Sequence, residues 1–172
     1  FKVVNMPFEK YKTDDKYHLI FSATAFHWIE TGFGYPRCHE LLTDDDILAV
    51  FWNTPRISNQ NLDLKHRIQE LYHEYLDDST DDINVDEWFE KRSKNYQYIM
   101  NLYGYRDLNS KSYFDTRVMN ADRYIGLLHT YSNHMALPKS KRDLFFGKIY
   151  AVISEYKSVI ISDTIDLHMG RK

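Results

Sequence analysis

The most informative segment of the chain reads Tyr17-His18-Leu19-Ile20-Phe21-Ser22-Ala23-Thr24-Ala25-Phe26-His27-Trp28-Ile29. Its first part is an almost continuous apolar run, which predicts a strand over residues 18–25 that is buried on both faces. The strand leads into small residues and then into an aromatic and imidazole cluster. Because ligands bind beyond the carboxyl ends of strands in open α/β sheets, the segment indicates a binding site. The alternative is that these aromatic residues only anchor the next helix.

The following segments indicate how this strand is connected. A second apolar run over 47–53 predicts another buried strand, and residues 35–42 have the pattern of a short helix. Asp44-Asp45-Asp46 predicts a turn, because aspartate hydrogen-bonds its own backbone there. A strand, a helix and a strand with short joints predict a right-handed crossover unit. Residues 1–5 predict a further strand at the start of the chain.

The rest of the chain predicts mainly helices. Apolar residues recur at helical spacing over 64–76 and 88–103, and an acidic loop over 77–82 lies between the two stretches. Asn84 with Glu87 three positions later resembles a capping box. The same reasoning predicts four further elements: a strand over 113–119, a helix from Asn120 to Met135 that ends before Pro138, a helix over 139–156 and a strand over 158–167.

Composition narrows the functional classes. The 172 residues are 43% apolar, which is enough for a buried core. The 22 basic and 25 acidic residues give a net charge of -3, which argues against a nucleic-acid module that binds through bulk positive charge. No apolar run approaches the roughly 20 residues that span a bilayer, so no membrane partner is expected. The single cysteine, Cys38, excludes an intrachain disulfide and favours a cytoplasmic, reducing location.

Familiar catalytic and metal-binding motifs are absent from the sequence. It contains no G-x-G-x-x-G, P-loop, C-x-x-C or H-E-x-x-H pattern. Neither the pair His66 and His73 nor the pair His129 and His134 has the spacing that a helix-borne zinc site prefers. We therefore expect no metal site. No serine, histidine and aspartate set suggests a nucleophilic triad either.

The segment from Leu19 to Ile29 resembles the fourth-strand motif of class I S-adenosylmethionine-dependent methyltransferases. Within that class it is similar to the branch of trans-aconitate methyltransferase-like and ubiquinone- or menaquinone-biosynthesis-like proteins. Residues 41–51 resemble the next element, although Asp44-Asp45-Asp46 stands where the family usually has a glycine-containing turn. Two later stretches resemble the far end of such proteins: Thr130-Tyr131-Ser132-Asn133-His134 and Asp163-Thr164-Ile165-Asp166-Leu167.

The resemblance implies an α/β fold, a partial Rossmann-like methyltransferase sheet that is mixed and flanked by helices. Its strands would be neighbours in the order His18, Ile47, Ser158 and Tyr113, with the Ser158 strand reversed. The family's first strand and glycine-rich cofactor loop have no counterpart, so residues 1–172 would be the C-terminal part of a methyltransferase domain. The chain would then begin at the family's third strand. Residues 60–106 would form a helical cap within the domain.

The resemblance also implies which residues contact the cofactor, S-adenosyl-L-methionine. Phe8 and Glu9 match the loop after the family's third strand, which borders the adenine. Ser22, Ala23 and Ala25 match the floor beside the cofactor. Small side chains at that position let a ligand approach the backbone closely.

Five residues match positions near the methyl acceptor. Phe26, His27 and Trp28 match the place where the cofactor and acceptor pockets meet. Tyr131 and His134 fall in a late helix that resembles part of the substrate lid, although plain core packing is the alternative for Tyr131. His27 is the nearest candidate for a catalytic general base, which is needed only if the acceptor is protonated at the working pH.

The function that the resemblance implies is methyl transfer from S-adenosylmethionine to a small-molecule acceptor. The chain would be an incomplete piece of the enzyme and inactive alone. A hypothesis from another class is a non-catalytic α/β interaction domain, or pseudo-methyltransferase, that pairs with a partner chain or a second copy through exposed sheet edges. A nicotinamide-dependent oxidoreductase is disfavoured, because the reversed last strand and residues 22–28 suit the methyltransferase pattern better.

Overall fold

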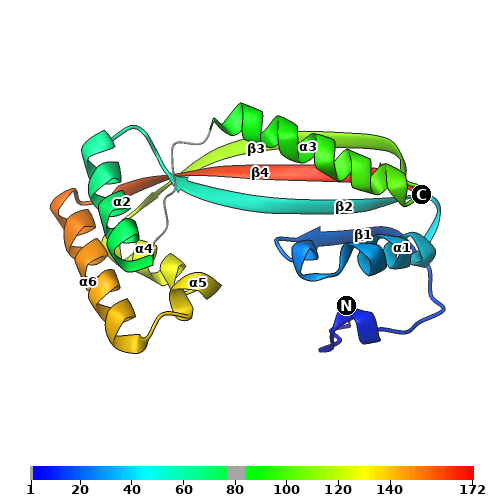
Figure 1. Cartoon of the computed structure of the whole chain (residues 1–172), viewed down its shortest axis with the longest axis horizontal. Helices are drawn as coiled ribbons and strands as arrows, with labels where there is room; N and C mark the ends of the chain where they lie inside the picture. Colours follow the sequence, from blue (N-terminus) through cyan, green and yellow to red (C-terminus); the bar gives the residue numbers. More distant parts are fainter. Residues whose placement is uncertain (1, 77–83) are drawn as a thin grey trace. The chain divides into compact units, whose positions relative to one another are not determined.

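The computed structural model describes residues 2–76 and 84–172. The chain divides into two compact units, whose elements are labelled in Figure 1. Unit 1 comprises Phe1–Asn53, Asn84–Tyr113 and Ile165–Lys172. Unit 2 comprises Thr54–Ile83 and Phe114–Thr164.

The described residues form one mixed, four-stranded sheet, flanked by helices. Its strands are β1 (Tyr17–Ala23), β2 (Leu42–Ile57), β3 (Arg106–Met119) and β4 (Val159–Arg171). The strand order is β1-β2-β4-β3, and β1 is parallel to β2. β4 is antiparallel to β2, because the Lys172 N–H donates to Asp46 in unit 1 and the Ser58 N–H donates to Ile160 in unit 2. The expected strand order and the reversed last strand are therefore confirmed.

The pairing of β1 with β2 contains a large irregularity. Tyr17 lies opposite Leu42, but Leu19 lies opposite Ile47, so two steps along β1 correspond to five along β2. Asp45 lies in the bulged part with a φ of 68°, a left-handed conformation that aspartate tolerates better than most residues. The turn predicted from three successive aspartates is thus a bulge inside a longer strand.

In unit 1, two long helices cover one face of the sheet. The helical elements are η1 (Phe8–Lys10), η2 (Phe26–Trp28), α1 (Thr31–Leu41) and α3 (Val85–Leu102). Leu48, Val50 and Trp52 alternate along β2 and pack in one cluster with Tyr35 of α1 and Met100 of α3. The helix predicted over 35–42 starts earlier than expected, because burial overrides the weak helical preference of the glycines and proline in its sequence.

In unit 2, helices surround a second apolar core. They are α2 (Leu62–Leu76), α4 (Ala121–Leu128), α5 (Ser132–Met135) and α6 (Lys139–Glu155). Ile68, Leu128, Phe145 and Ile149 are fully buried in this core. The continuous helix predicted from Asn120 to Met135 is wrong, since it breaks between α4 and α5. Ser, Asn and Thr side chains near the break compete with the helix for backbone hydrogen bonds, and the Asn133 side chain accepts one from the His134 N–H.

Several other sequence predictions can be compared with the structure. The strand over 1–5 is wrong for residues 2–5, which form no strand, and residue 1 lies outside the described residues. The strands predicted over 47–53 and 113–119 lie within β2 and β3, and the strand predicted over 158–167 begins one residue later, at Val159. The strand predicted over 18–25 ends at Ala23, and its predicted burial on both faces is wrong, because no residue of β1 is fully buried. The Asn84 cap of α3 is confirmed, because its side chain accepts hydrogen bonds from the Asp86 and Glu87 N–H groups.

The structure does not test the predicted acidic loop, the helical cap or the cytoplasmic location. The acidic loop over 77–82 falls outside the described residues. Residues 60–106 are divided between the two units, and their role as a cap stays a prediction. Among the described residues, no helix has the length and apolar character needed to cross a membrane. The cytoplasmic compartment stays a prediction as well.

Candidate functional site

The small residues that were predicted to lie beside the cofactor, Ser22, Ala23 and Ala25, are at the carboxyl end of β1. Ser22 is half-buried, whereas Ala23 and Ala25 are exposed. Between them, Thr24 has a φ of 51°, and its N–H donates to the carbonyl of Phe51 on β2. This hydrogen bond holds the strand end in place while the chain turns into η2.

The side chains of the predicted aromatic cluster, Phe26, His27 and Trp28, all belong to the short helix η2 but point in two directions. Phe26 is buried and packs edge-on against Tyr35, with ring centroids 4.9 Å apart. Gly34 faces this ring so closely that a Cβ there would lie 3.2 Å from Phe26. His27 and Trp28 are exposed, with ring centroids 5.0 Å apart. Phe26 therefore anchors η2, and the other two side chains remain accessible.

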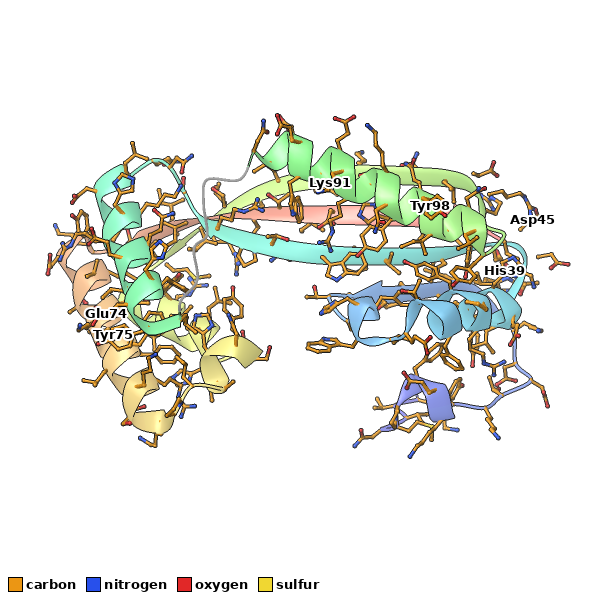
Figure 2. All side chains as sticks on the ribbon, viewed as in Figure 1. His39, Asp45, Glu74, Tyr75, Lys91 and Tyr98 are labelled. Atoms are coloured by element: carbon orange, nitrogen blue, oxygen red, sulfur yellow. The ribbon has the colours of Figure 1, made fainter. Side chains whose placement is uncertain are left out.

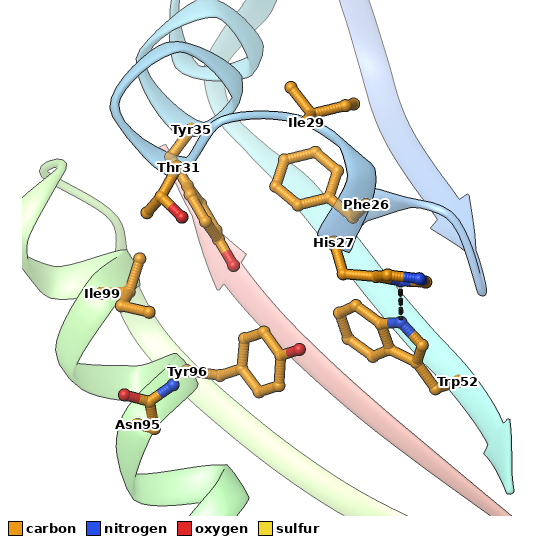
Figure 3. A pocket seen from close by; sticks show the side chains of 9 residues that line it. All are labelled: Phe26, His27, Ile29, Thr31, Tyr35, Trp52, Asn95, Tyr96 and Ile99. Atoms are coloured by element: carbon orange, nitrogen blue, oxygen red, sulfur yellow. Dashed lines mark hydrogen bonds between the residues drawn. The ribbon is translucent and has the colours of Figure 1, made fainter.

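A pocket of about 200 Å³ lies beside η2, entirely within unit 1. Figure 3 shows its walls, which come from η2, the start of α1, β2 and α3. Four of the lining residues are aromatic, two are isoleucines and three are polar: Phe26, Tyr35, Trp52 and Tyr96; Ile29 and Ile99; His27, Thr31 and Asn95. The sequence predicted the η2 wall as part of a binding site, but Trp52 and the residues from α3 were not predicted.

A hydrogen bond between two lining residues determines the tautomer of His27. The indole N–H of Trp52 donates to His27 Nδ1 over 2.9 Å (Figure 3). Since an indole nitrogen can only donate, Nδ1 accepts, and the neutral imidazole carries its proton on Nε2. A general base on this ring would have to use Nδ1, which Trp52 occupies. In this arrangement His27 accepts from Trp52 at Nδ1 and has its Nε2–H available to donate to a ligand. Its role as a catalytic base stays a prediction.

Replacing Trp52 with phenylalanine should change this tautomer. The variant keeps an aromatic ring on β2 but loses the donor, so His27 should shift from the nearly pure Nε2–H form to a mixture of tautomers. Imidazole nitrogen shifts in the NMR spectrum of ¹⁵N-labelled protein measure the two populations. An unchanged His27 spectrum in the Trp52→Phe protein would show that the hydrogen bond does not control the ring.

A buried polar network lies behind the Tyr96 wall of the pocket. Arg92 Nε and Asp166 Oδ2 form an ion pair of 2.7 Å, and Asp166 is fully buried. His168 Nε2 donates to the same oxygen over 3.2 Å, because a carboxylate accepts only. Ser110 then donates to His168 Nδ1 over 2.8 Å. Residues from α3, β3 and β4 meet here within unit 1, so the network fixes the position of Tyr96.

Aromatic rings join this network to the pocket. Tyr96 stacks on His168 and on Trp52, with centroid distances of 4.4 and 4.8 Å. The Arg92 guanidinium lies 4.8 Å from the Trp52 ring centroid and donates to the Tyr96 hydroxyl over 3.4 Å. Asp166 and His168 lie two positions apart on one face of β4, but the predicted strand ended at residue 167, so the sequence analysis did not identify this network.

Burial keeps the nucleophilic groups near the pocket protonated. Desolvation raises the pKa of Cys38 to about 12, so the buried thiol is neutral at neutral pH. Burial also raises the pKa of Tyr35 and of Tyr96, and for Tyr96 the nearby Arg92 opposes the increase. Both phenols are therefore O–H donors at neutral pH.

The remaining residues predicted for the site lie in different places. Phe8 packs edge-on against Phe33 in unit 1, at 6.1 Å between centroids, and Glu9 next to it is exposed. Tyr131 and His134 belong to unit 2. His134 is buried there, with Nε2 and the Tyr72 hydroxyl 3.0 Å apart, and Tyr131 packs against the same core. The structure thus brings Phe26 and His27 together at the pocket and gives Tyr131 and His134 a packing role in unit 2.

Comparisons with known proteins identify the fold. No protein-family model and no curated protein matches the chain. Among solved structures, a candidate type II methyltransferase from Anaeromyxobacter dehalogenans superposes with a TM-score of 0.56 and 14% sequence identity, over 91% of this chain and 65% of that chain. The chain has the Rossmann-like fold of methyltransferases and spans slightly less than two thirds of this protein's length.

Two further solved structures match with lower scores. A candidate methyltransferase from Bacillus halodurans has a TM-score of 0.42 at 13% identity, over 98% of this chain and 73% of that chain. Phosphoethanolamine N-methyltransferase 2 from Haemonchus contortus, in complex with phosphomonomethylethanolamine and S-adenosylhomocysteine, has a TM-score of 0.40 at 9% identity, over 94% and 35% of the two chains. At these identities the likeness concerns the fold alone.

Proposed function

We propose that this chain belongs to an enzyme that transfers a methyl group from S-adenosylmethionine to a small-molecule acceptor. The observation that carries the proposal is the sheet order β1-β2-β4-β3 with β4 reversed, in a chain whose fold matches a methyltransferase. The aromatic pocket in unit 1 lies beside the carboxyl end of the first strand, where ligands of open α/β sheets bind.

The residues at the end of β1 suit one wall of a cofactor site. Ser22, Ala23 and Ala25 have short side chains and are at least partly accessible, so a ligand could approach the backbone there. Phe8 and Glu9 are proposed to border the adenine. Glycine does not follow β1, where Thr24 takes the left-handed conformation instead. The described residues thus fit part of the cofactor's surroundings.

The pocket residues suit methyl transfer through positioning and exclusion of water. S-adenosylmethionine, when bound, supplies an electrophilic methyl group. Phe26 and Trp52 provide apolar walls that keep water from the reacting atoms, and His27 can donate from Nε2 to an acceptor oxygen or nitrogen. Trp28, exposed beside His27, is proposed to contact the acceptor as well.

Filling the space at the end of β1 tests the proposal. In the product of the gene that encodes this chain, Ser22→Trp should lower the affinity for S-adenosylmethionine at least 10-fold, because an indole occupies the proposed floor. Calorimetry measures binding, and methyl release from labelled cofactor measures activity. Asn101→Trp, at an exposed position of α3, is the matched control. Equal affinities for the two variants, or no cofactor binding by the unaltered protein, would contradict the proposal.

A second candidate function, an interaction domain, is favoured by the exposed face of β1. Leu19 and Phe21 are 54% and 64% exposed, and Phe21 stacks on Phe51 of β2 with centroids 6.4 Å apart. Among the described residues, β1 pairs with β2 alone, so one edge is open to another strand. A second copy or a partner chain would pair there. Sedimentation of the chain with and without Phe21→Glu tests this, and a monomer in both cases excludes self-pairing.

A further inference from the structure

The pocket in unit 1 combines aromatic walls with uncharged donors. None of its nine lining residues carries a carboxylate, an ammonium or a guanidinium. Figure 3 shows the Tyr35 hydroxyl directed into the space among the lining side chains, toward the Tyr96 ring on α3. Asn95 of α3 also lines the pocket. Burial keeps both phenols protonated, as their raised pKa values indicate. The pocket therefore offers O–H and amide donors without any negative charge.

The network behind the pocket strengthens one of these donors. Arg92 donates to the Tyr96 oxygen over 3.4 Å, which uses one lone pair and leaves the Tyr96 O–H free to donate onward. Donation to a hydroxyl polarises its own O–H bond, so successive hydrogen bonds reinforce one another. The buried carboxylate of Asp166 holds Arg92 in this position from the side of β4. A ligand atom with lone pairs is the complement to such a donor.

The charge and the size of the pocket both favour a small ligand without positive charge. Aromatic rings can bind cations through their faces, but the Arg92 guanidinium already lies 4.8 and 5.4 Å from the Trp52 and Tyr96 ring centroids. No lining carboxylate would accept hydrogen bonds from a cationic ligand, whereas the Tyr35 and Tyr96 hydroxyls can donate to a ligand oxygen. The pocket volume of about 200 Å³ is roughly one third larger than that of an engineered apolar cavity of roughly 150 Å³ that holds benzene. The pocket thus has room for one six-membered ring with a small substituent.

We infer that this pocket binds a single planar ring that bears an electron-rich oxygen, as in a monocyclic phenol or an aryl carboxylate. The ring lies among Phe26, Tyr35, Trp52 and Tyr96, and its oxygen accepts hydrogen bonds from the Tyr35 and Tyr96 hydroxyls. The ligand's role as the methyl acceptor rests on the proposed function, whereas its chemical class follows from the pocket alone.

The ligand class can be tested by binding without any cofactor. Benzoate and phenol should bind measurably in calorimetry or ligand-observed NMR, and benzylamine, which has the same ring with an ammonium group, should bind at least 10-fold more weakly. Cyclohexanecarboxylate tests the need for a planar ring and should also bind more weakly than benzoate. Benzylamine binding as tightly as benzoate would overturn the inference in favour of a cation site, and no binding by either oxygen ligand would overturn it outright.

Single hydroxyl deletions locate the binding to this pocket. Tyr35→Phe and Tyr96→Phe should each weaken benzoate binding about 3- to 30-fold, the loss expected for one hydrogen bond to a charged or neutral oxygen. Both variants keep the aromatic ring, and circular dichroism verifies folding; if one variant fails to fold, the other decides. Tyr98→Phe is the matched control, because Tyr98 lies on α3 like Tyr96 but is 68% exposed and does not line the pocket (Figure 2). Equal binding by all three variants would overturn the assignment.

The outcome for the ligand class is separate from that for methyl transfer. Benzoate binding that depends on Tyr35, in a protein with no affinity for S-adenosylmethionine, would support the ligand class and reject its role as methyl acceptor. Cofactor binding and methyl transfer to an amine, with no affinity for benzoate, would support the proposed function and reject the ligand class.

Discussion

Replacing Arg92 with methionine should lower the free energy of unfolding by about 3–5 kcal/mol, the usual cost of removing one partner from a buried ion pair. Asp166 is fully buried, and its Oδ2 contacts Arg92 and His168. Its other oxygen has no hydrogen-bond partner among the described residues. Without Arg92 the carboxylate would lose its main compensating charge while it stays away from water. Methionine keeps much of the apolar stem, so the loss reflects the charge.

Urea unfolding measures this loss of stability, and two further variants of the chain identify its cause. Arg106→Met removes an arginine from the exposed pair with Asp45 in the same unit, where pairs contribute little. The double variant Arg92→Met with Asp166→Leu removes both charges and should recover most of the stability. If Arg92→Met is no more destabilising than Arg106→Met, the buried pair does not support unit 1 as described.

The fold could be predicted largely from apolar runs. Residues 18–25 and 47–53 are apolar enough to identify two parallel strands, and the resemblance carried by the first run supplied the order of the others. The full length of β3 could not be predicted, because Asn109-Ser110-Lys111-Ser112 shows no apolar alternation. Such a polar segment becomes a strand through its hydrogen-bonded neighbour β4, which is information that lies far along the chain.

The candidate site could be predicted only where its residues are close in sequence. Phe26 and His27 follow a strand and were identified from that position. Trp52 was not, since its hydrogen bond with His27 joins residues 25 positions apart. The contact between Ser110 and His168 spans 58 positions. A single sequence contains no signal for such pairs, so the donor wall of the pocket and the network behind it required the structure.

Phe145→Ala should lower the free energy of unfolding by about 3–5 kcal/mol through the cavity it leaves in unit 2. Phe145 is fully buried on α6, with the rings of Tyr72 and Tyr75 at centroid distances of 5.2 and 5.4 Å. These rings and the neighbouring helices form a rigid surround that cannot collapse fully into the vacated space, so both burial and packing are lost.

The adjacent position on α6 provides the control. Leu144 is 62% exposed, so Leu144→Ala should change stability by no more than about 0.5 kcal/mol. Helical circular dichroism is the appropriate probe, because all three tryptophans, Trp28, Trp52 and Trp88, lie in unit 1 and their fluorescence does not report on unit 2 directly. Equal stability of the two variants would mean that α6 does not bury Phe145. Apolar side chains lie on several faces of α6, so its sequence pattern does not show which face packs into the core. A large loss of stability for Phe145→Ala alone would establish that the face bearing Phe145 does.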